Sequence, residues 1–287
     1  MLKRGVGLFL VIAIGATFAL EFVFYALGFI PSANDIDTRS LILFCAFMCI
    51  PGVAALVASS ADADPSSTSM QILPIQKNAV LLAIVLSLAV GVLPYAIASV
   101  LGLAKFDGEL STLKRVVPEI AMRPPAYIGV TGILLSVVLG LTVCALPALV
   151  SELGWRGYLQ QRLQPLGRTT AAFVTGIVQG IWWLPLALGG YLGAGAPAVQ
   201  AIGVMATSIA MAFVLGEIHR LTRSIGVCAL AMGLFFIQCM PDSMWNFFFP
   251  GADTFLVAPF GIMSSALWLL LALALSFVPS RMTTESV

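Results

Sequence analysis

The chain has 287 residues, of which 60% are apolar and only 9% are charged, and its mean hydropathy is +1.04. This composition excludes an ordinary water-soluble domain. The net charge of +1 gives no reason to expect nucleic acid as a partner. The expected surroundings of most of the chain are therefore those of a lipid bilayer.

Long apolar stretches recur along the sequence, and each is long enough to cross about 30 Å of hydrocarbon as a helix. They predict an all-α, polytopic transmembrane bundle of about eight spans, built as one membrane domain over residues 1–287. The expected spans are Val6–Ile30, Leu41–Ala61, Ala79–Leu103, Ala126–Val150, Arg168–Tyr191, Val199–Glu217, Ile225–Met240 and Pro259–Val278.

The distribution of basic residues predicts the orientation, because cytoplasmic loops are enriched in Lys and Arg. With the N-terminus in the cytoplasm, nine basic residues lie inside and five outside, so we expect this orientation and the inner, plasma membrane. The inside set is Lys3, Arg4, Lys77, Arg156, Arg162, Arg168, Arg220, Arg223 and Arg281; the outside set is Arg39, Lys105, Lys114, Arg115 and Arg123.

Two segments between the predicted spans have patterns that predict their local structure. The outside loop from Lys105 to Arg123 mixes apolar side chains with charges, as an amphipathic surface helix does. Residues 61–76 are rich in Ser, Asp and Pro, which is typical of a flexible connector. The five cysteines fall inside predicted spans without a CxxC spacing, which favours buried structural thiols.

Charged residues within or beside apolar spans are costly and are therefore candidates for function. Glu21 lies within the first span, where a polar partner or protonation would make it tolerable. Glu217 and His219 precede Arg220 and Arg223 at the end of the sixth span, so an interfacial charge cluster that anchors the helix end is the simpler interpretation.

Glu152 and Arg156 are more informative, because their i, i+4 spacing puts a carboxylate and a guanidinium on one helix face. The surrounding string is SELGWRGYLQQRL, beginning at Ser151. It resembles the first motif of the CAAX protease and bacteriocin-processing family of intramembrane endopeptidases, written EExxxR and often continued as GWRGYL. In this comparison Ser151 stands in the place of the first Glu.

The resemblance extends to the family's second motif in the next span. The string QGIWWLPL, beginning at Gln179, looks like the common form W-x-x-W-H-x-P-L and retains Trp182, Pro185 and Leu186. Trp183 stands where the His would be, and Gln179 replaces the usual aromatic residue.

The family's third motif, HxxxN or HxxxD, follows a short Thr-Gly-Ser turn. Residues 222–224, Thr-Arg-Ser, resemble that turn, and counting onward puts Met232 and Phe236 in the His and Asn places. The family-like core therefore covers about residues 126–240.

The resemblance implies that the first Glu would activate water, while the histidines and the Asn or Asp would orient it, bind metal or steady the oxyanion. These tasks need titratable or hydrogen-bonding groups. Trp offers a single donor, and Met and Phe offer almost nothing. The catalytic set is nearly absent, which leaves Glu152 and Arg156 as candidate remnants and makes the chain a catalytically degenerate member.

Two rearranged sites stay open as alternatives. Asp242 and Asn246 have the spacing of the third motif with Asp for His, and Glu152, Glu217 and His219 could converge as zinc ligands. No cofactor is otherwise expected.

Three functions follow from these observations. The favoured hypothesis is a non-catalytic protein that binds or scaffolds a membrane peptide, another membrane protein or a lipid. The alternatives are an intramembrane endopeptidase with an unorthodox site and a small-solute transporter, for which intramembrane Glu21 and prolines within spans are common features.

Overall fold

The computed structural model describes residues 4–27, 38–62, 71–189, 196–240 and 243–279, and within these ranges it contains helices and no strand. The long helices are α1 (Arg4–Ala26), α2 (Thr38–Ser60), α3 (Lys77–Val100), α5 (Pro125–Leu139), α6 (Ala145–Gly154), α8 (Arg168–Leu188), α9 (Pro197–Thr222), α10 (Ile225–Cys239) and α13 (Ile262–Ser276). Shorter elements are α4 (Ser111–Val116), η2 (Pro118–Ile120), α7 (Gln160–Leu163), η5 (Gln164–Leu166), α11 (Met244–Phe248) and α12 (Thr254–Val257).

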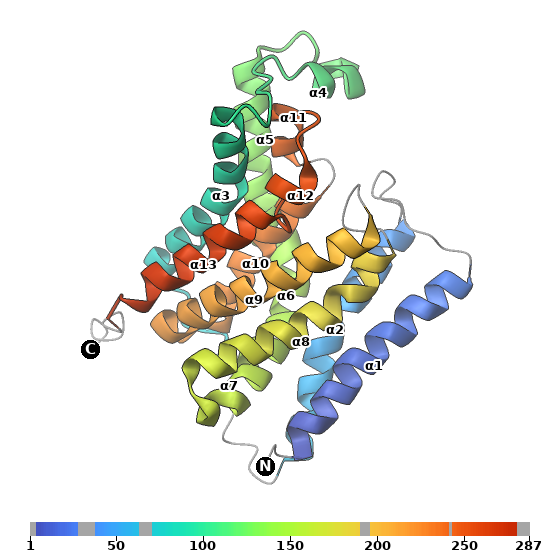
Figure 1. Cartoon of the computed structure of the whole chain (residues 1–287), viewed down its shortest axis with the longest axis vertical. Coiled ribbons are helices and arrows are strands. Elements are labelled where there is room, and N and C mark those ends of the chain that lie inside the picture. The colour runs from blue at the N-terminus through green and yellow to red at the C-terminus, as the bar shows by residue number, and fades with distance from the viewer. Residues whose placement is uncertain (1–3, 28–37, 63–70, 190–195, 241–242, 280–287) are drawn as a thin grey trace.

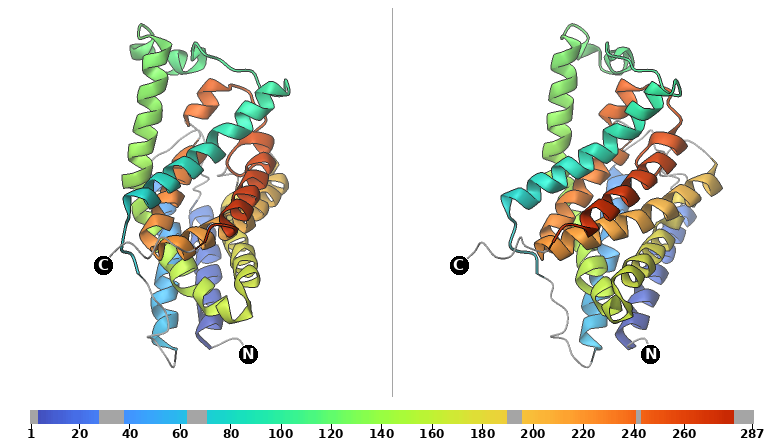
Figure 2. Two further views of the ribbon diagram at one scale, coloured as in Figure 1. Left: turned by 90° about the vertical axis from the view of Figure 1, so that its left-hand side faces the viewer. Right: turned by 60° about the vertical axis from the view of Figure 1, so that its left-hand side comes forward.

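The long helices form two layers, which Figure 1 shows one behind the other. In the front layer α1 packs on α8, α8 on α9, and α9 on α13. In the rear layer α2 packs on α6, α6 on α10, and α10 on α3. Contacts of α1 with α2 and of α9 with α10 join the layers, and the turned views show how α5 and α3 extend beyond them at one end (Figure 2).

Two π-helical turns interrupt the fourth long helical segment. The turn η3 (Gly140–Cys144) joins α5 to α6, and the turn η4 (Trp155–Leu159) joins α6 to α7. A π turn inserts an extra residue into a helix and re-aims the side chains around it, and such turns are frequent at functional sites. The second turn holds the WRGYL part of the sequence motif.

Two glycines allow the rear layer to pack with its backbones nearly touching. A Cβ at Gly154 would collide with the backbone of Pro51 in α2, and one at Gly233 would collide with the backbone of Gly140 and Ala145. Small residues at such crossings let membrane helices approach closely. These two contacts fix α6 between α2 and α10.

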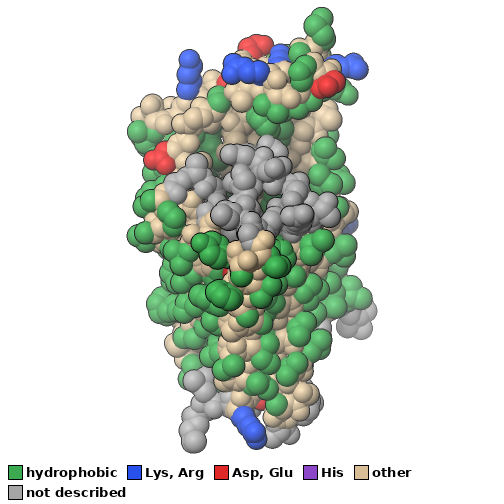
Figure 3. Space-filling view, turned by 90° about the vertical axis from the view of Figure 1, so that its right-hand side faces the viewer, with side chains coloured by type: hydrophobic (Ala, Val, Ile, Leu, Met, Phe, Trp, Pro, Cys, Tyr) green, Lys and Arg blue, Asp and Glu red, His purple; other side chains and the backbone are tan. Residues whose placement is uncertain are grey.

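The outer surface carries a broad band of exposed aliphatic side chains. Examples from four helices are Val11, Leu81, Leu134 and Ile202. Figure 3 shows this hydrophobic surface between charged side chains, which gather at the end formed by α4 and reappear at the opposite end. A surface of this kind is incompatible with water and fits the hydrocarbon interior of a bilayer.

Among the described residues, eight helical segments are long and apolar enough to cross a membrane. The prediction of an all-α, polytopic bundle of about eight spans is therefore confirmed, and the protein is an integral, multi-pass membrane protein. The ends predicted at Ile30 and Tyr191 lie outside the described residues.

Helical structure does not stop at Val150, the predicted end of the fourth span. The helical segment that begins at Pro125 continues through its two π turns to Leu166. Sequence reasoning ended the span early because Glu152 and Arg156 are charged, but the two side chains pair with each other and the helix continues past them. Similarly, α9 continues past the predicted end at Glu217 to Thr222.

The segment Lys105–Arg123 forms a shorter helix than its amphipathic pattern predicts. It contains the six-residue α4 and the turn η2, and it buries Leu110 and Leu113 against Ile128 of α5 and Met244 of α11. The segment thus covers one end of the bundle (Figure 1).

Candidate functional site

The first motif lies on α6 and the π turn that follows it. Glu152 and Arg156 are both fully buried, and Arg156 Nη1 donates to Glu152 Oε1 at 2.9 Å. The same nitrogen donates to Gln179 Oε1 of α8 at 3.1 Å. Three residues singled out from two separate motifs therefore meet in one buried polar group.

A charged pair in a low-dielectric interior is tolerated only when its members satisfy each other. The Glu152 and Arg156 pair does this in part. Within the described structure, Glu152 Oε2 and two Arg156 nitrogens, Nε and Nη2, have no hydrogen-bond partner. The pair is therefore held in place by its own hydrogen bonds, and these three atoms remain able to form further ones.

Ser151, in the place of the family's first Glu, makes a structural hydrogen bond. It is fully buried, and its Oγ accepts a hydrogen bond from Trp155 Nε1 at 3.0 Å. Both residues belong to the same motif, so the bond closes one turn of helix. This arrangement occupies the position where the family's carboxylate would stand.

The other motif positions meet in a cluster of aromatic rings, which we call the aromatic centre: Phe47, Trp182, Trp183 and Phe236. The Trp183 ring lies 5.1 Å from the Phe47 ring and 5.8 Å from the Phe236 ring, centroid to centroid. Phe47 stacks on Trp182 at 4.0 Å. All four side chains are buried.

Met232 lies on α10 one helical turn before Phe236, on the same helix face, and it is buried as well. The counted positions of the second and third motifs therefore converge in space. What they offer there is apolar surface and the single indole donor of Trp183.

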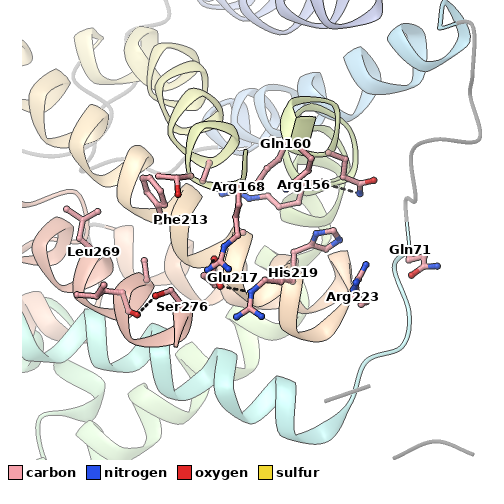
Figure 4. Close-up of a pocket in the computed structure, with 18 residues that line it drawn as sticks. Gln71, Arg156, Gln160, Arg168, Phe213, Glu217, His219, Arg223, Leu269 and Ser276 are labelled. Carbon is pink, nitrogen blue, oxygen red and sulfur yellow. Dashed lines mark hydrogen bonds and ion pairs between the residues drawn. The ribbon is translucent and has the colours of Figure 1, made fainter. Parts of the chain in front are cut away.

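A second polar region opens beside Arg156, and we call it the arginine cavity. It has a volume of about 700 Å³ and lies between the C-terminal end of α9, the N-terminal end of α8, and the motif helix. Figure 4 shows its labelled side chains. The polar ones include Arg156, Gln160, Arg168, Glu217, His219, Arg220 and Arg223.

Glu217 organises this cavity. Its Oε1 lies 2.5 Å from Arg168 Nη2 of α8, and its Oε2 accepts from Arg220 Nε at 2.8 Å. Arg220 also donates to the carbonyls of Leu275 and Val278 at the end of α13. The cluster ties α9 to α8 and α13, in line with the interpretation of these charges as an anchor.

The two rearranged catalytic sites gain no support from this arrangement. Asn246 accepts a hydrogen bond from Tyr95 of α3 and lies on α11, near α4 at the end of the bundle. Asp242 falls outside the described residues. Glu152 is held by Arg156 while Glu217 is held by Arg168 and Arg220, and the described part of the chain has no group of three or more His, Cys, Asp or Glu side chains that could hold a metal ion.

Sequence reasoning missed one polar cluster entirely. Asp62 belongs to the segment expected to be a flexible connector, but its side chain is buried, with Oδ2 2.7 Å from Arg162 Nη2. The same oxygen accepts from Tyr158 of the motif turn at 2.9 Å. Ile72, from the same segment, accepts hydrogen bonds from Ser224 and Gly226 through its carbonyl oxygen. Residues 63–70 lie outside the described structure.

The eight apolar helical segments and the buried Glu152 and Arg156 pair define a class, that of polytopic membrane proteins with a polar site inside the bundle. Residues 133–237 match the family model of type II CAAX prenyl endopeptidase, Rce1-like proteins. The match runs from α5 to α10 and includes every motif position discussed above. Over this part of the chain, the match supports the resemblance to the CAAX protease and bacteriocin-processing family recognised from the motifs. No curated protein matches the chain.

Proposed function

We propose that this chain is a non-catalytic member of its family, a binding or scaffold protein for a membrane peptide or another membrane protein. The observation that carries this proposal is the aromatic centre. Trp183 and Phe236 occupy the places of a His and an Asn, and their rings pack against each other with Phe47 at the side. Peptide hydrolysis needs groups that move protons, and these rings supply none; the indole of Trp183 adds a single hydrogen-bond donor.

The retained residues serve shape and packing. The Glu152 and Arg156 pair joins α6 to α8 through Gln179, and Gly154 brings α6 against α2. A binding protein needs such a rigid frame even where the chemistry is gone. The N-terminus in the cytoplasm and residence in the inner, plasma membrane are part of this proposal and rest on the distribution of basic residues.

One observation favours the alternative of an unorthodox endopeptidase. Glu152 Oε2 has no hydrogen-bond partner within the described structure, so one oxygen of a retained motif carboxylate is not used by packing. The carboxylate is fully buried, and proton transfer to a substrate would require the bundle to open around it.

A peptidase assay separates these two functions. Purified full-length chain in neutral detergent is incubated with a prenylated CAAX peptide and with a pool of leader peptides, beside an active family member as positive control. We expect no cleavage by the wild type or by Glu152→Gln, which keeps the shape of the side chain. Cleavage by the wild type that Glu152→Gln abolishes would overturn the proposal.

The second part of the proposal, that the chain binds a membrane peptide or another membrane protein, is tested by crosslinking in cells. A photo-crosslinking amino acid at exposed Leu146 or Ile202 should capture a defined partner in cells. The same probe at Met122, at the bundle end near α4, serves as the reference position. Crosslinks of equal pattern from all three positions would speak against a specific partner.

A further inference from the structure

The arginine cavity is built with more positive charge than its carboxylates compensate. Four guanidinium groups line it, from Arg156, Arg168, Arg220 and Arg223. Glu217 is the one carboxylate among its lining residues, and Glu152 pairs with Arg156 behind the wall. Even when both carboxylates are counted, two positive charges remain for an occupant.

Buried hydrogen-bonding atoms at the cavity wall have no protein partner. Arg156 is fully buried and lines the cavity, and its Nε and Nη2 donate to nothing within the described residues. Gln160 lines the same wall, is 5% exposed, and has an unpartnered Oε1. Leaving such groups unsatisfied costs free energy, so a ligand that accepts from the guanidinium would be stabilised there.

The helix geometry adds to the attraction for an anion. Arg168 and Thr169, the first two residues of the 21-residue helix α8, line the cavity, and no side chain caps this N-terminus. Free backbone N–H groups and the positive end of the helix dipole favour a negative group at such a place. Planar guanidinium groups match the oxygens of a phosphate in bidentate fashion.

The cavity also has an apolar side. Phe213 of α9 and Leu269 and Leu273 of α13 line it. Leu269 and Leu273 are 49% and 57% exposed on a membrane-spanning helix, so this side continues onto the surface that meets the hydrocarbon. A soluble anion would leave this wall unused, whereas an acyl chain would cover it.

We propose that the arginine cavity binds the phosphate headgroup of an anionic lipid, with the acyl chains lying along α9 and α13. Arg223, Arg168 and the free nitrogens of Arg156 hold the phosphate, and Leu269 and Leu273 contact the chain. The site is separate from the aromatic centre, and the inference stands whether or not the chain cleaves peptides.

The test measures lipid binding to the full chain in neutral detergent by native mass spectrometry. Dioleoyl phosphatidic acid is compared with dioleoyl phosphatidylcholine and with inorganic phosphate. We expect phosphatidic acid to bind at least about tenfold more tightly than phosphatidylcholine, because its exposed phosphomonoester carries net negative charge, whereas the choline of phosphatidylcholine neutralises and shields its phosphate. Equal binding of the two lipids would overturn the proposal.

Matched variants assign the binding to the cavity. The double variant Arg168→Gln, Arg223→Gln removes two partly or fully exposed guanidinium groups and should weaken phosphatidic acid binding about tenfold or more. The control Arg115→Gln removes an exposed guanidinium from α4 at the other end and should leave binding unchanged. Binding that is unaffected in the double variant, with an unchanged elution profile, would place the lipid elsewhere.

A last comparison distinguishes the two sources of phosphate. Leu273→Ser should weaken phosphatidic acid binding and leave any binding of inorganic phosphate unchanged, because it alters only the apolar side. If millimolar inorganic phosphate displaces phosphatidic acid completely and Leu273→Ser has no effect, the occupant is a soluble anion and the lipid proposal fails.

Discussion

The aromatic centre and the arginine cavity differ in how their interiors are filled. Arg156 lines the cavity and donates to Gln179, which lies one helical turn before Trp183 on α8. The aromatic centre is closed, with its rings packed in stacked, tilted and edge-to-face contacts and buried. The arginine cavity is open over about 700 Å³ and lined by charges. Packed rings occupy the positions that the motif comparison assigns to the second and third motifs, while the polar side chains of the cavity remain available. We infer that ligand binding, if retained, belongs to the cavity.

The largest effect is expected at Arg156, which lines the arginine cavity and pairs with Glu152. Arg156→Leu leaves Glu152 as an uncompensated charge in the interior and should destabilise the protein by about 3 to 5 kcal/mol. The measurement is thermal unfolding in neutral detergent, followed by fluorescence-detected size exclusion.

The double variant Glu152→Met, Arg156→Leu is the matched control for this prediction. It replaces both members of the pair by apolar side chains of similar size, so much of the lost stability should return. If the double variant is less stable than Arg156→Leu alone, the pair is not the source of the loss.

A change of nearly the same size is expected in the aromatic centre itself. Trp183→Ala opens a cavity among Phe47, Trp182 and Phe236 and should cost about 3 to 5 kcal/mol. Trp183→Phe keeps one ring and should cost distinctly less. Equal melting of wild type and Trp183→Ala would show that the centre is loosely packed, which would weaken the case for a filled catalytic site.

The third prediction concerns Ser151. Ser151→Ala leaves the buried Trp155 Nε1 without its acceptor and should cost about 1 to 2 kcal/mol, the price of an unsatisfied donor. Any peptidase activity found in the wild type should be unchanged, since the hydroxyl is committed to packing. Loss of activity at full stability would instead assign Ser151 a chemical role.

The sequence predicted the membrane spans well because hydrocarbon thickness imposes a length on apolar stretches, and this constraint is local. It also predicted that Glu152 and Arg156 share a helix face, where the structure pairs them, because i, i+4 spacing is local as well. It did not predict that the helix of the fourth span continues past Val150 to Leu166, since a hydropathy pattern counts two charges as a boundary even when they neutralise each other inside the bundle.

The arginine cavity could not be predicted in this way. Arg156, Arg168 and Arg223 come from three separate elements, and only the folded chain brings them around one space. Each of these arginines, considered alone beside a helix end, is typical of an ordinary interfacial anchor. Asp62 was missed for the same reason, because its partner Arg162 lies far away in the sequence and the local composition indicated a connector.

The smallest expected change in stability, and the only gain, is at Arg223. This residue ends α9 in the left-handed conformation, with φ of 55°, where glycine is usual because a side chain adds strain. Arg223→Gly relieves that strain, and after the entropy cost of glycine it should stabilise the protein by about 0.5 to 1 kcal/mol. Thermal unfolding in detergent measures this gain.

The same variant should weaken binding of phosphatidic acid, because a cavity guanidinium is lost. Stability and binding would then move in opposite directions, as expected where a strained residue is kept for its side chain. Gly226→Ala, near the start of α10, offers a contrast, because its Cβ would press on the Ile72 carbonyl and should lower stability without touching the cavity charges. If Arg223→Gly lowers stability and leaves lipid binding intact, Arg223 serves the helix end, and the arginine cavity loses one of its proposed phosphate ligands.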